Sequence, residues 1–170
     1  MSYDEWAETV PSTLRNDPLW RREDYRLGLY IADLGWDDVR RLARLRETGD
    51  LSDQLCRALG SIGANIAEGY SRAPGLDRAR FYEYALGSAR EGRDWYHKAR
   101  HVLGPRTAKH RLRVLTSIIR LLTHSVPAER VTTVKPRSTE PYDGASGGPE
   151  ATPARLIQAT RNTQPTRSAD

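Results

Sequence analysis

Basic side chains recur along the segment from residue 105 to residue 126 at a spacing that places them on one side of a helix. At 100° per residue they share one arc opposite an aliphatic stripe, and they are Arg106, Lys109, His110, Arg113, Arg120 and His124. No Asp or Glu occurs from Ala99 to Ala128, and Lys98 and Arg100 add charge just before the segment. A dense stripe of one sign attracts a phosphate backbone, with an affinity that falls as salt rises. The pattern predicts a surface for nucleic acid or another polyanion.

The same stripe has a plainer interpretation as the solvated face of a helix in an arginine-rich protein. The chain carries 27 Lys and Arg against 22 Asp and Glu, and a basic balance favours acidic partners without choosing among them. An acidic protein, or the acidic N-terminal arm of the chain itself, is therefore the alternative partner. No aromatic residues are interleaved with the stripe, which argues against stacking on single-stranded bases.

Patterns typical of catalysis are missing from the sequence. There is no Gly-x-Ser-x-Gly elbow and no glycine-rich loop leading into Lys-Ser or Lys-Thr. Asp94, His97 and His101 share a helix face, but no further metal ligand is evident. Cys56 is the only cysteine and borders an apolar stripe, which predicts a small buried side chain. We therefore expect a protein that is not an enzyme and holds no metal or cofactor.

Four helices are needed to position these side chains, because four segments repeat apolar residues with a period of 3.6. Asp17, Ser52 and Asp77 are suited to cap the first three helices, and Pro127 is expected to end the fourth. The first helix should bury Leu27, Ile31, Leu34, Leu42 and Leu45. The expected helices cover approximately residues 18–46, 52–70, 77–103 and 105–126.

Short connections make consecutive helices antiparallel neighbours, and no segment alternates as a strand does. The predicted fold is therefore an all-α, up-down-up-down four-helix bundle over residues 18–126. An acidic arm over 1–17 precedes it. The tail over 127–170 is rich in Pro, Thr, Ser and Gly, which predicts disorder. No apolar window approaches the ~20 residues that span a bilayer, and no signal pattern is present, so we expect a cytoplasmic protein without membrane contact.

Two segments of the sequence match a known signature. Residues 61–72 read Ser-Ile-Gly-Ala-Asn-Ile-Ala-Glu-Gly-Tyr-Ser-Arg, and residues 81–91 read Phe-Tyr-Glu-Tyr-Ala-Leu-Gly-Ser-Ala-Arg-Glu. Together they resemble the bacterial four-helix-bundle proteins encoded by intervening sequences of 23S ribosomal RNA, over approximately residues 20–125. The resemblance implies a ring-like homo-oligomer, often a pentamer. A related branch, the accessory proteins of diversity-generating retroelements, binds nucleic acid and partners a reverse transcriptase, so the resemblance implies these partners as well.

The first expected helix is apolar on a second side, whereas a helix in a lone bundle needs only one apolar side. Large aromatic side chains on such a face are typical of interfaces, so we predict a subunit interface formed by Tyr25, Leu29, Trp36 and Val39. The alternative is that the N-terminal arm covers this face with Trp6 or Trp20. Asp38 falls within the apolar arc, where it either meets an arginine or turns toward solvent.

Polar residues also stand at the matching signature positions, namely Asn65, Glu68, Gly69, Ser88 and Glu91. One interpretation is a polar network between helices or subunits that fixes their register. The other is a capped and solvated helix end. In either case a structural role is favoured over catalysis.

These patterns favour a non-enzymatic, oligomeric helical scaffold that binds nucleic acid through a basic helix face, as an accessory to a reverse transcriptase or to ribosomal RNA. The alternative is a protein–protein interaction module without nucleic-acid binding.

Overall fold

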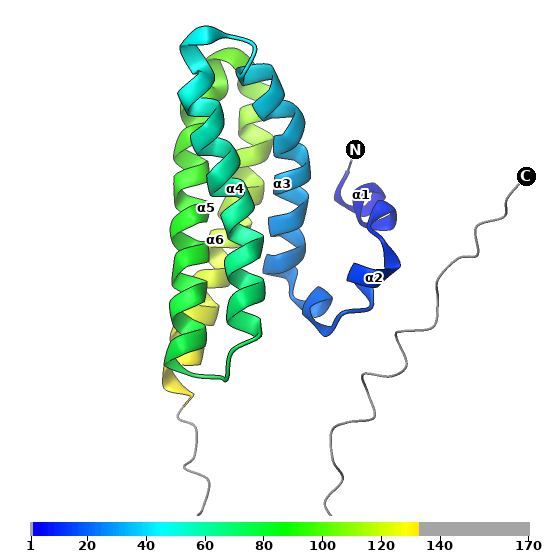
Figure 1. Ribbon diagram of the computed structural model, residues 1–170, viewed down its shortest axis with the longest axis vertical. Coiled ribbons are helices and arrows are strands. Elements are labelled where there is room, and N and C mark those ends of the chain that lie inside the picture. Colours follow the sequence, from blue (N-terminus) through cyan, green and yellow to red (C-terminus); the bar gives the residue numbers. More distant parts are fainter. Residues whose placement is uncertain (1, 133–170) are drawn as a thin grey trace, which may run out of the picture. The chain divides into compact units, whose positions relative to one another are not determined.

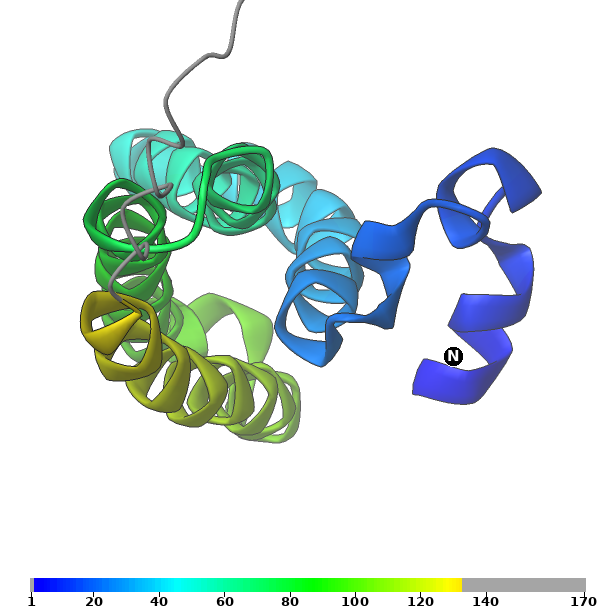
Figure 2. The same ribbon diagram turned by 90° about the horizontal axis from the view of Figure 1, so that it is seen from below.

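Helices form all the regular structure within residues 2–132, which are the residues that the computed structural model describes. Four long helices, α3 to α6, run antiparallel to their neighbours in the sequence (Figure 1). Viewed end-on, they surround one core, with α3 beside both α4 and α6 (Figure 2). The elements are α1 (Tyr3–Thr9), α2 (Ser12–Arg15), the 3-10 turn η1 (Pro18–Arg21), α3 (Glu23–Leu42), the 3-10 turn η2 (Arg46–Thr48), α4 (Gly49–Tyr70), α5 (Leu76–Leu103) and α6 (Pro105–Val131).

The all-α bundle is confirmed within this range, where no strand occurs. The predicted tail falls mainly on residues 133–170, which lie outside the described residues. None of the described helices is both long and apolar enough to cross a membrane.

The predicted start of the first long helix was wrong. Asp17 does act as a cap, accepting a hydrogen bond from the Leu19 backbone N–H at 2.7 Å, but it caps only η1, and α3 begins at Glu23. Because α3 ends at Leu42, Leu45 lies beyond it and is 44% exposed rather than buried.

The predicted caps of the second and third helices were also wrong. Ser52 is buried inside α4, where its hydroxyl donates to the Val39 carbonyl of α3 at 3.2 Å. Asp77 lies within the first turn of α5, and Gly75 occupies the cap position with a φ of +123°. That backbone conformation is open to glycine and strained for other residues.

The last helix continues through Pro127 to Val131, beyond its predicted end. Proline at this position leaves the Thr123 carbonyl without its helical partner, but both residues are exposed, so water can bond that carbonyl. The added turn is held to the bundle by Glu129, which pairs with Arg78 of α5 at 3.5 Å. Contacts with α5 therefore outweigh the local preference of proline to end a helix.

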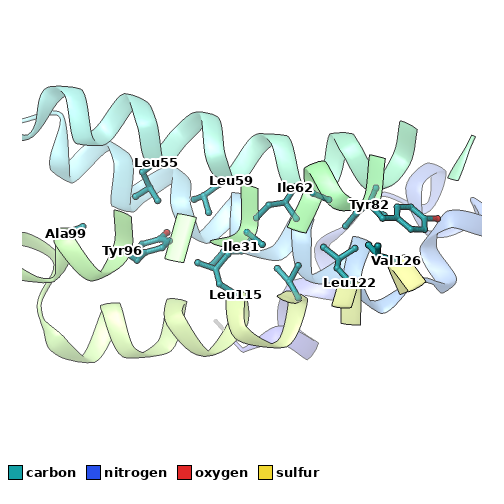
Figure 3. Packing of buried hydrophobic residues seen from close by; sticks show 14 of the residues in the cluster. Ile31, Leu55, Leu59, Ile62, Tyr82, Tyr96, Ala99, Leu115, Leu122 and Val126 are labelled. Carbon is teal, nitrogen blue, oxygen red and sulfur yellow. The ribbon is translucent and has the colours of Figure 1, made fainter. Parts of the chain in front are cut away.

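The core is built from aliphatic residues of all four helices, with two buried tyrosines among them (Figure 3). The side chains of Ile31, Ile62 and Leu115 are fully buried near its centre. Several inner positions of α5 are small, and a Cβ added at Gly92 would come within 3.3 Å of the Leu59 Cδ2 atom of α4. The absence of a side chain at Gly92 therefore lets α4 approach α5 closely.

One buried polar cluster joins three helices of the bundle. Asp38 of α3 is almost fully buried, and its Oδ2 atom accepts from the Arg111 Nε of α6 at 2.7 Å and from the Tyr96 hydroxyl of α5 at 3.1 Å. The pKa of Tyr96 is raised mainly by burial and secondly by the Asp38 carboxylate. The hydroxyl therefore keeps the proton that it donates to Asp38. Of the two placements considered for Asp38, contact with an arginine is the one observed.

The N-terminal arm packs against α3 through Trp6, which is 1% exposed. The Trp6 ring lies 5.1 Å from the Tyr30 ring, centroid to centroid, and its indole N–H donates to the Asp33 carboxylate at 2.6 Å. Tyr3 meets the Tyr30 ring edge-on at 5.4 Å. The arm therefore covers one flank of α3, while Trp36, on another flank, is 64% exposed.

Candidate nucleic-acid interface

A hollow of about 500 Å³ lies on the surface between α5 and α6. Four cationic side chains border it, and its remaining lining is mostly apolar. The cations are Arg100, Lys109, Arg113 and Arg120, and the other lining residues are Pro105, Ala108, Leu112, Thr116 and Ser117. All four cations belong to the set predicted from the sequence.

The helical repeat of α6 explains why these cations gather at one seam. Leu115, Ile118 and Leu122 face the core, which turns positions 109, 113 and 120 outward along the side of α6 next to α5. The connection between the two helices is the single residue Gly104, at a φ of +86°. So tight a turn places Arg100, in the last turn of α5, beside the first turns of α6.

The cations of this hollow are not neutralised by any carboxylate of the described residues. Among residues 2–132, no carboxylate lies within ion-pair distance of Lys109, Arg113 or Arg120. Arg111 of the same helix is the contrast, because it turns inward to Asp38. The outward cations are therefore available to an external anion.

A second hollow of about 310 Å³ adjoins the first and shares Leu112 with it. It is lined on α5 by Arg90, Arg93, Asp94 and His97. We call the two hollows together the basic groove. Arg90 and Arg93 were not predicted, although their spacing with His97 and Arg100 (three, four and three residues) places all four on one face of a helix.

Four predicted binding residues do not line the basic groove. Arg106 and His124 are exposed elsewhere on α6. Lys98 pairs with Asp94 at 2.6 Å, and its ammonium lies 4.1 Å from the centre of the Trp95 ring. His110 meets the Tyr30 ring near the arm, with the two ring centroids 6.3 Å apart.

The charge of His110 is also smaller than the sequence stripe suggested. The pKa of His110 is lowered from its ordinary value of 6.5, mainly by partial burial and secondly by the cationic side chains of Arg111 and Arg113. Its ring is therefore mostly neutral at pH 7 and adds little to the attraction for an anion.

The four residues of the predicted subunit interface have different surroundings in the structure. Tyr25 and Val39 are partly buried against the core, and Leu29 packs against the cluster that contains Trp6. Of this set only Trp36 is exposed, and it lines a hollow of about 170 Å³ between α3 and α4. Cys56 lines this hollow and is exposed, so its predicted burial was wrong.

A metal centre is not evident in the described part of the chain. No group of three His, Cys, Asp or Glu side chains lies close enough together there to hold a metal ion. Asp94, which shares a helix face with His97 and His101, is instead engaged with Lys98.

The fold and the signature segments can be placed against known proteins. A family model described as "23S rRNA-intervening sequence protein" matches residues 37–128, more than half of the chain. The chain belongs to this family. The resemblance inferred from residues 61–72 and 81–91 is thus confirmed, and the family match begins within α3, after the arm.

A crystal structure of a protein of unknown function from the S23 ribosomal protein family of Bacteroides thetaiotaomicron has the same fold. It is 22% identical, with a TM-score of 0.57, and the alignment covers 61% of this chain and 97% of that one. Comparison with curated proteins gave no match.

In this member of the 23S rRNA-intervening sequence family, the polar signature residues bond locally. Asn65 donates to the Ser61 carbonyl at 2.8 Å, and Ser88 donates to the Tyr84 carbonyl at 2.9 Å. Glu91 accepts from the Trp95 indole N–H at 3.1 Å, and Glu68 pairs with Arg72 just after α4. Within residues 2–132, no hydrogen bond or ion pair joins any of these four to another long helix.

Gly69 is the signature residue that makes an interhelical contact. A Cβ added there would lie 2.7 Å from Cε1 and 2.9 Å from Cδ1 of the Tyr82 ring on α5. Gly69 therefore allows a buried aromatic ring to pack directly on the backbone of α4.

Proposed function

We propose that this chain is a non-enzymatic, oligomeric helical scaffold that binds nucleic acid through the basic groove between α5 and α6. The observation that carries the proposal is the set of cations around that groove that have no carboxylate partner among residues 2–132. Arginine side chains with free guanidinium groups suit phosphate oxygens, with which they form charge-assisted hydrogen bonds. The family takes its name from 23S rRNA, which supports a role as an accessory to ribosomal RNA or to a reverse transcriptase.

Reversing two charges of the groove tests the nucleic-acid proposal. The double variant Arg113→Glu with Arg120→Glu is expected to weaken binding to RNA and DNA at least about tenfold near 0.1 M salt. It should also lower the slope of log affinity against log salt by about 2, because two phosphate contacts are lost. Filter binding over a range of salt concentrations measures both quantities.

Arg44→Glu with Arg57→Glu is the matched control, because both of these arginines are exposed and lie outside the basic groove. It changes the net charge equally and should retain most of the affinity. Absence of binding even at low salt, or equal loss in both double variants, would contradict the proposal. A protein partner retained from nuclease-treated lysate would then favour a protein-interaction module.

We further propose that the chains self-associate through the exposed Trp36 between α3 and α4. A large exposed aromatic side chain at an apolar hollow is typical of an interface anchor, and this hollow lies between different helices from the basic groove. A ring of subunits would therefore leave the groove open.

Trp36→Asp is expected to raise the dissociation constant of the assembly by about 30-fold or more, since anchors contribute about 2 kcal/mol or more. Light scattering over a concentration series would show smaller particles than for the wild type. Leu76→Asp is the control, because Leu76 is 75% exposed and lies outside this hollow. A wild-type protein that is monomeric at all concentrations would refute the idea.

A further inference from the structure

We infer that the basic groove selects unpaired nucleic acid, with a base lying on its apolar floor and the flanking phosphates on its cationic rim. The inference rests on the proposed nucleic-acid function and adds the form of strand that the groove takes. It is carried by the juxtaposition of two kinds of lining, because Pro105, Ala108 and Leu112 line the same hollow as the four cations.

The floor of the hollow is poorly explained by phosphate binding alone. A phosphate oxygen gains hydrogen bonds from Arg113 or Arg120 but gains nothing from the Leu112 side chain. A hollow of this volume is in the range of small-molecule sites, and one planar base buries apolar surface when it lies on such a floor. The lining therefore matches a ligand that has a flat apolar body between charged groups.

A duplex meets this requirement poorly. Its bases are stacked inside and its outer surface presents sugar and phosphate, so it would touch the rim and leave the floor uncovered. Unpaired segments can turn single bases outward, and proteins stack such bases on arginine guanidinium planes as well as on aromatic rings. Arg100 and Arg113 line the same hollow, so their guanidinium planes take the place of the aromatic rings that the sequence stripe lacks.

The test compares three fluorescent 20-nucleotide probes on the full-length protein at one salt concentration. The probes are a single-stranded oligouridylate, an RNA duplex, and an abasic single strand with the same phosphate spacing. We expect the oligouridylate to bind about tenfold more tightly than either of the others, which corresponds to about 1.4 kcal/mol. The abasic strand should retain the salt slope of the oligouridylate, because both carry the same charges.

Leu112→Gln makes the floor polar at nearly constant size and should reduce the preference for the oligouridylate over the abasic strand. Thr123→Gln, an exposed change on the same helix outside the groove, is its control. The probe comparison needs only the wild-type protein, so it remains decisive if Leu112→Gln fails to fold.

The outcomes separate the two proposals. If no probe binds at low salt, the nucleic-acid function itself is wrong. If all probes bind equally, or the duplex binds best, that function stands and the selection of unpaired strands is refuted. An amphipathic acidic peptide that binds more tightly than the oligouridylate would identify the occupant as a protein segment and overturn the inference.

Discussion

Asp38→Ala is expected to lower the free energy of unfolding by about 3 kcal/mol or more. Removing one member of a buried ion pair leaves the other charge without compensation, which costs about 3–5 kcal/mol. Here Arg111 would lose its only carboxylate partner among the described residues, and the Tyr96 hydroxyl would lose its acceptor. Urea unfolding followed by circular dichroism measures the change.

Asp37→Ala provides the matched control, because Asp37 is the adjacent residue and is exposed. Its effect should stay within about 0.5 kcal/mol. Adding Arg111→Met to Asp38→Ala should recover part of the lost stability, since no buried charge is then left unpaired. Equal stability of the Asp37 and Asp38 variants would show that the cluster contributes nothing to the bundle.

Gly69→Ala is expected to destabilise the protein by about 1–3 kcal/mol, although alanine is the better helix former. The added methyl group would overlap the Tyr82 ring, which is fully buried. Overpacking of this kind in a close-packed core costs about 1–3 kcal/mol. The melting temperature in differential scanning calorimetry reports the loss.

Gly87→Ala, on α5, separates this contact from helix propensity. A Cβ at Gly87 would meet no heavy atom within 4 Å, so alanine there should stabilise the helix by about 0.5–1 kcal/mol. The two glycine variants should thus shift the melting temperature in opposite directions. A rise for both would mean that the Tyr82 ring yields easily and that Gly69 is not needed for packing.

The long helices and their order were predictable because their apolar residues repeat so regularly. Their ends were less so, because they depend on contacts that are remote in sequence. Ser52 has the chemistry of a cap, yet its hydroxyl is used inside α4 by the Val39 carbonyl. Pro127 has the chemistry of a terminator, yet Glu129 and Arg78 hold the next turn in place.

The residues of the basic groove could be predicted only in part from the sequence, for a similar reason. A helical wheel finds the outward cations of α6, but it says nothing about which neighbour completes a surface. Arg90 and Arg93 became part of the groove only because α5 packs beside α6. Arg111 and His110 are neighbours in the same basic segment of the sequence, yet Arg111 pairs with Asp38 inside the bundle and His110 meets Tyr30 near the arm.

The arrangement of the bundle also bears on how it assembles. Most of its packing joins consecutive helices through short turns, and folds dominated by such local contacts reach the native state within microseconds to milliseconds. The seam between α3 and α6 is the exception, since Asp38 and Arg111 are 73 residues apart. The entropic cost of closing a loop grows with the number of residues in it, so the contact between α3 and α6 has the largest such cost. The buried ion pair stabilises this contact.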